Sequence, residues 1–552
     1  MKAFKKRGIL IALGALLLCS GVFFGFDRDD KNFEISKNLN IYHTLFRELN
    51  MFYVDEIDSG DLIKKSMDAM LSSLDPYTTF IPESEMEDFK LMTTGEYAGI
   101  GSLISKHGDD VIVAEPYKGL PADKAGLRAG DVFVEINGIK VDKKDTEDVS
   151  NLLKGQANVP ITIKVRRPGV DKLVEKEVIR AEIQLKSVPY HGLLSDSIGY
   201  INLNQFTNKA AGEVKSALRE LKEQHAKSII LDLRGNPGGL LDQAVDIVNL
   251  FVEKGENIVS TKGKVSQWDK TYSAEHEPMD TEIPIAVLVS RGSASASEIV
   301  SGAIQDLDRG IVVGQRTFGK GLVQTTRNLS YNSKLKVTTA KYYIPSGRCI
   351  QALDYSHRNE DGSVGKVPDT LISEFKTKNG RKVFDGGGIL PDVKVKLDLF
   401  SSLSVGLIRD FKIFDFATLY ANTHKHISDA NTFEFSDADY EEFKQFLKAE
   451  KFEYESESTE ILEALKKAAK EEKYYEIAET EFDNIAAKLA PNIDRDLKLF
   501  KKEISTLLAH EIVKRYHYQT GGIQYALRDD ETLSKAIELI KDQDKYRGIL
   551  KK

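Results

Sequence analysis

Apolar and polar residues alternate along the middle of the chain in a pattern that predicts a layered core. Short apolar runs rich in β-branched residues predict strands within Ile198–Phe206, Ser228–Gly239, Ile283–Ser290 and Ile311–Gly314. Apolar residues at helical spacing predict helices over Ala210–His225 and Leu240–Phe251, and another that begins near Ser295. Because strands that alternate with helices indicate parallel pairing, we expect an α/β core with parallel strands over residues 186–399.

The regions at both ends of this core are predicted to be helical. Residues 31–94 carry apolar side chains at helical spacing: Leu39, Tyr42, Leu45, Phe46 and Leu49. They end near an Asp-Pro turn that begins at Asp75. Residues 400–552 are highly charged, with acid–base pairs four residues apart that are typical of solvated helices on a bundle. We therefore expect an N-terminal helical cap subdomain and a C-terminal helical accessory domain for docking, oligomerisation or gating.

Residues 95–185 show the pattern of a small β-rich domain. Val111–Tyr117 is an apolar run that predicts a strand, and Lys143–Leu153 has the spacing of a short amphipathic helix. The Asn137-Gly138 pair supplies the positive φ angles of a tight turn between two further strands. A chain of 552 residues is too long for a single core, so we expect this region to be a separate domain.

The N-terminus has the charge pattern of a membrane-inserted segment. Basic residues precede an uncharged run over residues 8–26, and acidic residues follow it. A helix of this length spans about 28 Å, close to the thickness of the hydrocarbon core, and the flanking charges orient the rest of the chain outward. We expect residues 1–30 to form an uncleaved signal anchor. A cleaved signal peptide is the rival interpretation, although GVFFGFD offers no small-x-small cleavage site.

Composition narrows the possible partners and cofactors. The net charge of −8 is spread along the chain, and no basic domain points to nucleic acid. The two cysteines, Cys19 and Cys349, do not form a disulfide framework because Cys19 lies in the apolar N-terminal run. The ten histidines lack metal-ligand spacing, so we expect neither a metal nor another cofactor.

Ser295 is the strongest candidate for a catalytic nucleophile. It follows the predicted strand Ile283–Ser290 and opens a predicted helix, so the N–H of Ala296 and the positive end of the helix dipole lie beside its hydroxyl. The simpler interpretation is a helix cap, because Ser295 and Glu298 match the S-x-x-E capping box. Ser293 and Ser297 are assigned turn and capping roles.

Lys320 is the candidate base for Ser295. It lies in a glycine-flanked loop among three apolar residues, Phe318, Leu322 and Val323. Desolvation by such neighbours lowers the pKa of an ammonium group, which allows it to act as a general base near neutral pH. Gln324 lies four residues further on and shares a face with Lys320, where it can hold the amine in place. Serine with lysine is an established variant of the nucleophile–base pair.

The segments SASASE and TFGKGLVQ together resemble the signature of the C-terminal processing peptidases, also called tail-specific proteases. The resemblance implies a serine endopeptidase with a crotonase-like α/β core, in which Ser295 is the nucleophile, Lys320 the base and Gln324 the residue that orients it. The segment LDLRGNPGG resembles the turn of that family that provides a second oxyanion N–H beside Ala296. Either Gly238 or Gly239 fits this role, and the sequence does not distinguish them.

The pattern AGLxxGDxxxxING in residues 95–185 resembles a PDZ domain of the bacterial protease type. Such domains bind an extended peptide at a sheet edge and hold its terminal carboxylate with backbone amides. Four residues stand at the position of the family's carboxylate-binding loop: Gly99, Ile100, Gly101 and Ser102. The alternative for these residues is an ordinary glycine turn.

The sequence therefore predicts a multidomain α/β protein with a helical cap, a PDZ domain, a protease core and a C-terminal helical domain. The expected function is cleavage of bacterial envelope proteins by a Ser–Lys peptidase anchored in the inner membrane and facing the periplasm. Its expected partners are proteins with unstructured C-terminal tails, the membrane at its N-terminus, and another copy or an adaptor at the C-terminal domain. The rival hypotheses are a scaffold that has lost activity and a different hydrolase on the same core.

Overall fold

A computed structural model describes residues 32–194, 197–359, 362–396 and 399–551 of the chain. The chain divides into two compact parts, one that ends at Phe80 and one that begins at Ile81. The predicted signal anchor over residues 1–30 lies outside the described residues and stays a prediction. Where the structure describes the chain, it contains no helix with the length and apolar character needed to span a membrane.

The first part contains a helix over residues 32–52 and a second helix, α2 (Ser59–Ser72). The carboxylate of Asp75 closes the predicted Asp-Pro turn by accepting hydrogen bonds from two backbone amides, both at 2.8 Å. The next helix, α3 (Met86–Thr94), belongs to the second part of the chain. The expected helical subdomain over residues 31–94 is therefore divided between the two parts.

The small β-rich domain has the strand order β3-β4-β5-β7-β8, with β6 paired to β5, and β2 pairs with β9 beside it. Its elements are β2 (Glu96–Gly99), β3 (Ser102–His107), β4 (Asp110–Pro116), α4 (Pro121–Lys124), β5 (Val132–Ile136), β6 (Ile139–Lys140), α5 (Thr146–Leu153), β7 (Pro160–Arg166), β8 (Val174–Ile179) and β9 (Ala181–Gln184). Asn137 and Gly138 have φ angles of 49° and 81° and form the predicted turn between β5 and β6. Val149 and Leu153 bury one face of α5 in the core of this domain.

A six-stranded sheet forms the α/β core, in the order β10-β11-β12-β15-β16-β23. Its strands are β10 (Tyr190–Leu194), β11 (Ile198–Asn202), β12 (Ser228–Asp232), β15 (Ile285–Val289), β16 (Ile311–Gly314) and β23 (Val393–Lys394). The strands from β11 to β23 are parallel, as the sequence predicts, and only β10 is antiparallel to its neighbour. Three helices bury their apolar residues against one face of this sheet: α6 (Ala210–Glu223), α7 (Leu241–Asn249) and α8 (Ala296–Asp306).

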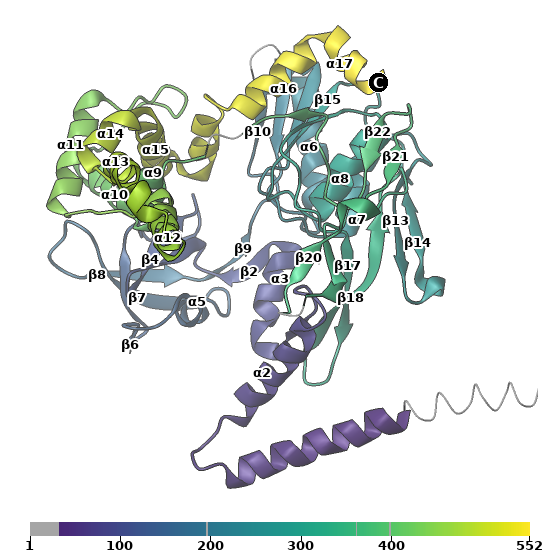
Figure 1. The fold of residues 1–552 in the computed structure, drawn as a ribbon, viewed down its shortest axis with the longest axis horizontal. Coiled ribbons are helices and arrows are strands. Elements are labelled where there is room, and N and C mark those ends of the chain that lie inside the picture. Colours follow the sequence, from purple (N-terminus) through teal and green to yellow (C-terminus); the bar gives the residue numbers. More distant parts are fainter. Residues whose placement is uncertain (1–31, 195–196, 360–361, 397–398, 552) are drawn as a thin grey trace, which may run out of the picture. The chain divides into compact units, whose positions relative to one another are not determined.

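The other face of the sheet is covered by the last two helices, α16 (Glu531–Lys541) and α17 (Gln543–Lys551), drawn in yellow in Figure 1. Leu533 and Tyr546 belong to the same apolar cluster as residues of the central strands. The Tyr546 hydroxyl is 3.0 Å from both the backbone nitrogen and the carbonyl oxygen of Ile285. The sequence placed these helices in an accessory domain over residues 400–552, whereas they pack as a layer of the α/β core.

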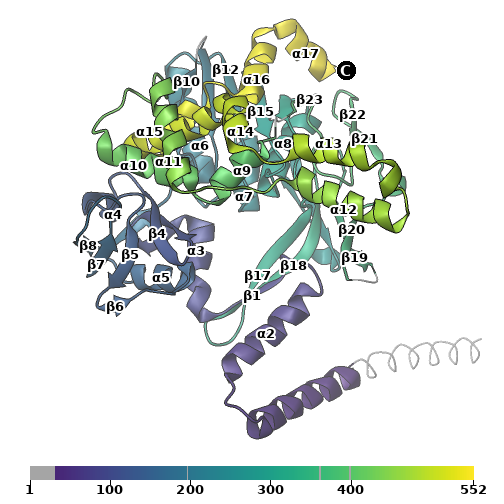
Figure 2. The same cartoon turned by 60° about the vertical axis from the view of Figure 1, so that its left-hand side comes forward.

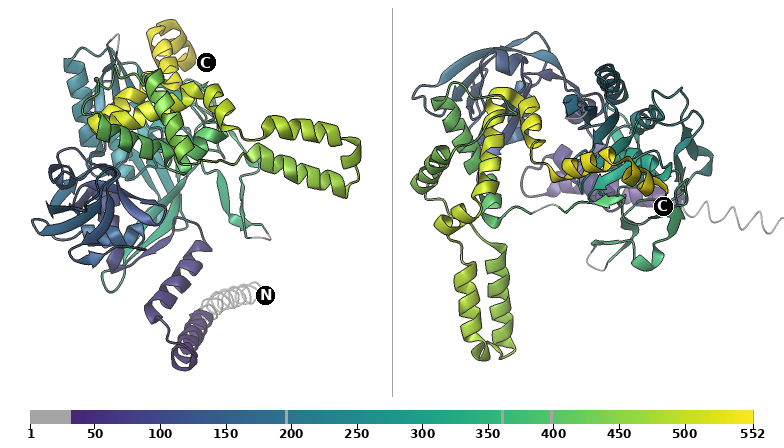
Figure 3. Two further views of the ribbon diagram at one scale, coloured as in Figure 1. Left: turned by 90° about the vertical axis from the view of Figure 1, so that its left-hand side faces the viewer. Right: turned by 90° about the horizontal axis from the view of Figure 1, so that it is seen from above.

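The remaining C-terminal helices have a core of their own, in which Phe416, Phe443 and Leu508 are buried. They are α9 (Ser402–Arg409), α10 (Lys412–Thr423), α11 (Asp437–Ala449), α14 (Ile493–Leu499) and α15 (Lys501–Ala526). Two further helices, α12 (Glu457–Glu471) and α13 (Glu479–Leu489), lie side by side as a hairpin (Figure 3). The helical character predicted for this region is confirmed, and its acidic and basic side chains lie largely on the exposed helix faces.

A second, antiparallel group of strands comes from segments that lie between the core strands in the sequence. The loop of Lys320 leads into one of its strands. The group contains β13 (Asn257–Gly263), β14 (Lys270–Ser273), β17 (Leu322–Asn328) and β18 (Lys334–Tyr343). Figure 2 shows β17 and β18 as a long two-stranded ribbon. Short pairs complete this region: β19 (Leu353–Arg358) with β20 (Val364–Lys366), and β21 (Glu374–Lys376) with β22 (Lys382–Phe384).

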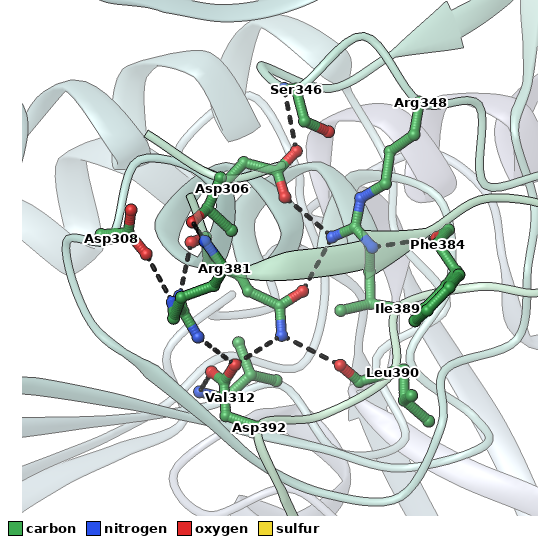
Figure 4. A network of polar contacts seen from close by, with 12 residues as sticks. Asp306, Asp308, Val312, Ser346, Arg348, Arg381, Phe384, Ile389, Leu390 and Asp392 are labelled. Atoms are coloured by element: carbon green, nitrogen blue, oxygen red, sulfur yellow. Dashed lines mark hydrogen bonds and ion pairs between the residues drawn. The ribbon is translucent and has the colours of Figure 1, made fainter. Parts of the chain in front are cut away.

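A buried polar network holds the C-terminal end of α8 (Figure 4). Asp306 and Arg348 form an ion pair at 2.8 Å, and their side chains are 0% and 1% exposed. Arg381 forms ion pairs with Asp308 and Asp392, and Asp392 also accepts a hydrogen bond from the backbone N–H of Val312 on β16. The network therefore fixes one end of the helix whose other end carries Ser295.

We expect Arg348→Met to destabilise the core by about 3–5 kcal/mol, because it leaves the carboxylate of Asp306 buried without its cation. The measurement is chemical denaturation of the purified variant and the wild type. In the double variant Asp306→Leu/Arg348→Met no charge is left unpaired, so most of the loss should be recovered. A single variant as stable as the wild type would contradict this account of the network.

Candidate active site

Ser295 lies between β15 and α8, at the N-cap of the helix, as the sequence predicts. Its φ and ψ angles are 55° and −113°, in a region that residues with a side chain rarely adopt. Ala294 and Ala296 on either side are buried, whereas Ser295 itself is half-buried. A strained turn that lifts a hydroxyl out of a buried segment is the local geometry expected of a nucleophile.

The turn that carries Ser295 is joined to the glycine turn after β12. The Ser293 hydroxyl donates to the carbonyl of Leu233 at 2.7 Å. The carbonyl of Asn236 accepts both the Ser297 hydroxyl at 2.9 Å and the backbone N–H of Ala294 at 3.0 Å. Ser293 and Ser297 therefore have structural roles, but Ser297 binds the neighbouring turn instead of capping α8. The two turns are held as one unit at the carboxyl ends of adjacent parallel strands.

Gly238 packs directly against the turn that carries Ser295. A Cβ atom at Gly238 would lie 2.7 Å from the carbonyl oxygen of Ala294 and 2.8 Å from the Cβ of Ser295. Its φ angle of 102° also disfavours any other residue. Ala296, the first residue of α8, has a backbone N–H with no acceptor inside the helix, so this donor is available beside the Ser295 hydroxyl.

The hydrogen bonds of the glycine turn distinguish its two glycines. The N–H of Gly238 donates to the Asn236 side-chain oxygen at 2.8 Å and is therefore engaged. Within the described parts of the chain, the N–H of Gly239 has no hydrogen-bond acceptor. The carbonyl of Phe206 accepts a hydrogen bond from the N–H of Leu240 at 2.9 Å, and the N–H of Phe206 donates to the carbonyl of Gly238 at 3.1 Å. The residues before and after Gly239 are therefore both bound to Phe206. This difference favours Gly239 as the second oxyanion donor.

Glu298 connects the turn that carries Ser295 to the loop of Lys320. Its side chain is fully buried, and its Oε2 atom accepts the backbone N–H of Ser295 at 2.9 Å and that of Lys320 at 2.8 Å. Its Oε1 atom accepts the Thr317 hydroxyl at 2.6 Å and the N–H of Gly319 at 2.7 Å. Burial raises the pKa of Glu298 to about 7, although these four hydrogen bonds oppose the shift by stabilising the carboxylate.

Lys320 lies in the loop between β16 and β17 and is half-buried. Phe318, which the sequence placed among its desolvating neighbours, is 50% exposed, whereas Leu322 is only 7% exposed. The apolar setting of the amine is therefore less complete than expected. Tyr342, from β18, contacts the carbonyl oxygens of both Lys320 and Ser295 through its hydroxyl.

Gln324 lies on β17, two residues into the strand. Its side-chain amide donates to the hydroxyl of Thr338 on β18 at 3.1 Å. This bond fixes the amide plane of Gln324 on the strand that follows the Lys320 loop. The assignment of Gln324 as the residue that orients the amine stays a prediction.

The predicted carboxylate-binding loop joins β2 to β3 in the small β-rich domain. Two of its carbonyl groups are held by hydrogen bonds. The carbonyl of Ile100 accepts from the N–H of Ala122 at 2.8 Å, and the carbonyl of Gly101 accepts from the N–H of Tyr117 at 3.0 Å. Burial raises the pKa of Tyr97 to about 12, although the nearby backbone of Gly101 and Ser102 opposes this shift by stabilising the phenolate. A peptide carboxylate at these amides would have to share or displace the Tyr97 hydroxyl.

Sequence reasoning did not identify three of the residues that shape these sites. Glu298 entered it only as half of a capping box, and Tyr342 and Tyr97 did not enter as functional residues. The capping box was the one available signal, because the side chain of Glu298 does bind the backbone N–H of Ser295. No local pattern marks Tyr342, which meets Ser295 only through the fold.

Comparison with known proteins covers most of the chain. Residues 197–357 match the model of peptidase family S41, residues 112–167 match the PDZ domain, and residues 403–540 match the model described as "Probable PDZ-protease, C-terminal helical domain". A carboxy-terminal-processing protease from Bartonella bacilliformis is 37% identical over 342 residues, which cover 61% of this chain and 76% of the relative. A probable CtpA-like serine protease from Staphylococcus aureus is 36% identical over 346 residues, which cover 62% of this chain and 68% of the relative.

Among solved structures, the photosystem II D1 C-terminal processing protease is 29% identical to this chain. The match covers 64% of this chain and 91% of that protein, with a TM-score of 0.35.

Proposed function

The chain belongs to peptidase family S41 as a carboxy-terminal-processing serine protease with a PDZ domain, and we propose that Ser295 and Lys320 form its catalytic dyad. The observation that carries the proposal is the position of Ser295, strained at the N-terminus of α8 and joined through Glu298 to the backbone of Lys320. The two side chains thus start from segments that share one buried carboxylate. No histidine is needed for this chemistry.

In the proposed mechanism, the Ser295 hydroxyl attacks the scissile carbonyl while the neutral amine of Lys320 takes its proton. The N–H groups of Ala296 and Gly239 stabilise the oxyanion of the tetrahedral intermediate. Lys320 then gives the proton to the leaving amine, which releases one product and leaves an acyl group on Ser295. Water, deprotonated by Lys320, hydrolyses this ester and restores the enzyme. Gln324 limits the rotation of the amine during these transfers.

Substrate selection is proposed to occur in the PDZ domain. An extended C-terminal tail would add as a strand beside β3, with its carboxylate at the amides of the loop from Gly99 to Ser102. Support comes from the anchored carbonyls of this loop, which hold its amides in a fixed orientation. The substrates are then proteins with unstructured C-terminal tails.

The proposed location is the bacterial cell envelope, with residues 1–30 as an inner-membrane anchor and the catalytic part in the periplasm. The charge pattern around residues 8–26 supports this orientation. The helices from α9 to α15 are proposed to dock an adaptor or a second copy, because they have a core separate from the one that carries Ser295.

Tail recognition is tested by two peptides of one sequence, one with a free C-terminal carboxylate and one with an amide. We expect the free acid to bind about 10- to 100-fold more tightly, because the amide removes a charge-assisted hydrogen bond worth roughly 1.5–3 kcal/mol and presents donors to donors. Fluorescence anisotropy with the full-length Ser295→Ala variant measures both affinities without cleavage. Equal affinities would mean that the PDZ domain does not recognise C-terminal carboxylates. This result would leave the proposed dyad unaffected.

A further inference from the structure

Glu298 and Tyr342 hold the same two residues from opposite sides of the backbone. We propose that they are positioning residues that clamp Ser295 and Lys320 at the separation needed for proton transfer, without touching the substrate. This inference rests on the proposed dyad and adds to it the part of the fold that sets its geometry.

The amide side of the clamp is Glu298. Its Oε2 atom bridges the N–H groups of Ser295 and Lys320, at 2.9 and 2.8 Å, so a single atom joins the two chain segments. The side chain is 0% exposed, and its other oxygen is held by Thr317 and Gly319. A buried carboxylate that accepts four hydrogen bonds has little freedom to move, so the two amides are fixed relative to each other.

The carbonyl side of the clamp is Tyr342. Its hydroxyl lies 3.2 Å from the carbonyl oxygen of Ser295 and also contacts that of Lys320. The residue is 1% exposed, and its own N–H donates to Gly321 at 3.0 Å, beside Lys320. Ser295 and Lys320 are therefore each held at both their N–H and their carbonyl group.

The clamp is needed to hold Ser295 in place because the backbone of Ser295 is strained. A residue with a φ angle of 55° tends to relax unless its surroundings hold it, and relaxation would move the hydroxyl away from the amine. Proton transfer requires heavy atoms within about 2.6–3.2 Å. A misplacement of about 1 Å can reduce the rate about 100-fold.

The first test is Glu298→Gln in the full-length protein, assayed with a quenched fluorogenic peptide that has a free C-terminus. A glutamine keeps the shape of the side chain, but its NH₂ group replaces one carboxylate oxygen. Two of the four groups that donate to the carboxylate would then face another donor. We expect kcat to fall about 10- to 100-fold with KM nearly unchanged, as for loss of a charge-assisted contact made to the catalytic backbone. The matched control is Asp496→Asn, which neutralises a carboxylate that is 3% exposed in the C-terminal helices and should leave kcat unchanged.

The second test is Tyr342→Phe, which removes only the hydroxyl. We expect kcat to fall about 3- to 10-fold, in line with the loss of a neutral hydrogen bond. The matched control is Tyr546→Phe, because Tyr546 is 5% exposed and belongs to the helix layer on the opposite face of the sheet, where its hydroxyl contacts the backbone of Ile285. It should lower the melting temperature by a similar amount and leave kcat unchanged.

The pH profile separates positioning from simple loss of stability. In the wild type, protonation of Lys320 and of Glu298 should each lower kcat, so log kcat should rise with a slope approaching two on the acid side. The titratable groups at the clamp are the side chains of Lys320, Glu298 and Tyr342. In Glu298→Gln one protonation is gone, and the slope should approach one.

The possible results separate the clamp from the dyad. Wild-type kcat at every pH in both Glu298→Gln and Tyr342→Phe, with Ser295→Ala inactive, would overturn the clamp and leave the dyad in place. If Glu298→Gln does not fold, Tyr342→Phe against Tyr546→Phe decides: a kcat loss confined to Tyr342→Phe supports the clamp, and equal kcat in both refutes it. Turnover by Ser295→Ala itself would instead overturn the proposed function.

Discussion

Ser295→Ala and Lys320→Ala should each lower kcat by at least about four orders of magnitude, as when a member of a nucleophile–base pair is removed. The alanine at position 295 has no atom to form the acyl-enzyme, and the alanine at position 320 has none to accept the proton. Both side chains are partly exposed, so truncating them should disturb the packed core less than truncating a fully buried residue would. The variants should therefore unfold at nearly the temperature of the wild type.

The measurement is turnover of a fluorogenic peptide by each purified full-length variant, together with its melting temperature. Gln324→Ala is the graded comparison and should retain more activity, since the role proposed for Gln324 is only to orient the amine. Near-normal turnover in either of the first two variants, with an intact fold, would remove that residue from the dyad.

Gly238→Ala should lower kcat about 100- to 1000-fold, the range for loss of one oxyanion donor. The added Cβ atom would lie 2.7 Å from the carbonyl oxygen of Ala294 and 2.8 Å from the Cβ of Ser295, so it must push the turn that carries Ser295 away from the glycine turn. The two proposed oxyanion donors, the N–H groups of Ala296 and Gly239, would then be displaced relative to each other. The effect should appear in kcat more than in KM, because the oxyanion forms only in the transition state.

Gly255→Ala is the matched control for this substitution. Gly255 also has a positive φ angle, 93° compared with 102° for Gly238, but its Cβ position is open: apart from its two chain neighbours, no atom of the described residues lies within 4 Å. It should cost stability through backbone strain without lowering kcat. Equal kcat losses in both variants would show that strain, and not the approach to Ser295, accounts for the effect.

Local pattern was sufficient to predict the elements that carry Ser295 and Lys320. The apolar run before Ser295 became β15, the predicted second strand became β16, and α8 begins at Ala296. These predictions succeeded because strand, tight turn and helix are each encoded within a few residues. Parallel pairing followed from the alternation of strands and helices.

Contacts between distant residues could not be predicted in the same way. In the sequence Glu298 matches a helix cap, because its contact with Ser295 is only three residues away. Its contacts with Thr317, Gly319 and Lys320 depend on where the loop after β16 lies in the fold. Tyr342 reaches the same place from β18, and no spacing in the sequence marks it. The choice between Gly238 and Gly239 likewise depends on the side chain of Asn236, which engages only one of the two amides.

The role of the last helices was missed for a similar reason. Their acidic and basic residues suggested a solvated bundle, and their apolar stripes fit a bundle and a sheet face equally well. Only the structure shows Tyr546 bound to the backbone of Ile285, so that α17 belongs to the layer behind β15.

The central claim is that the amine at position 320 is the base that titrates during catalysis. Lys320→Cys, made with Cys19 and Cys349 changed to serine and alkylated with 2-bromoethylamine, carries a thialysine of nearly the same length and lower basicity. Because the base must be neutral to take the Ser295 proton, a less basic amine is active at lower pH. We predict that alkylation restores turnover and shifts the acid limb of kcat to lower pH relative to Lys320 in the same background. Failure to restore turnover, or restored turnover with an unshifted acid limb, would contradict the assignment of Lys320 as the base.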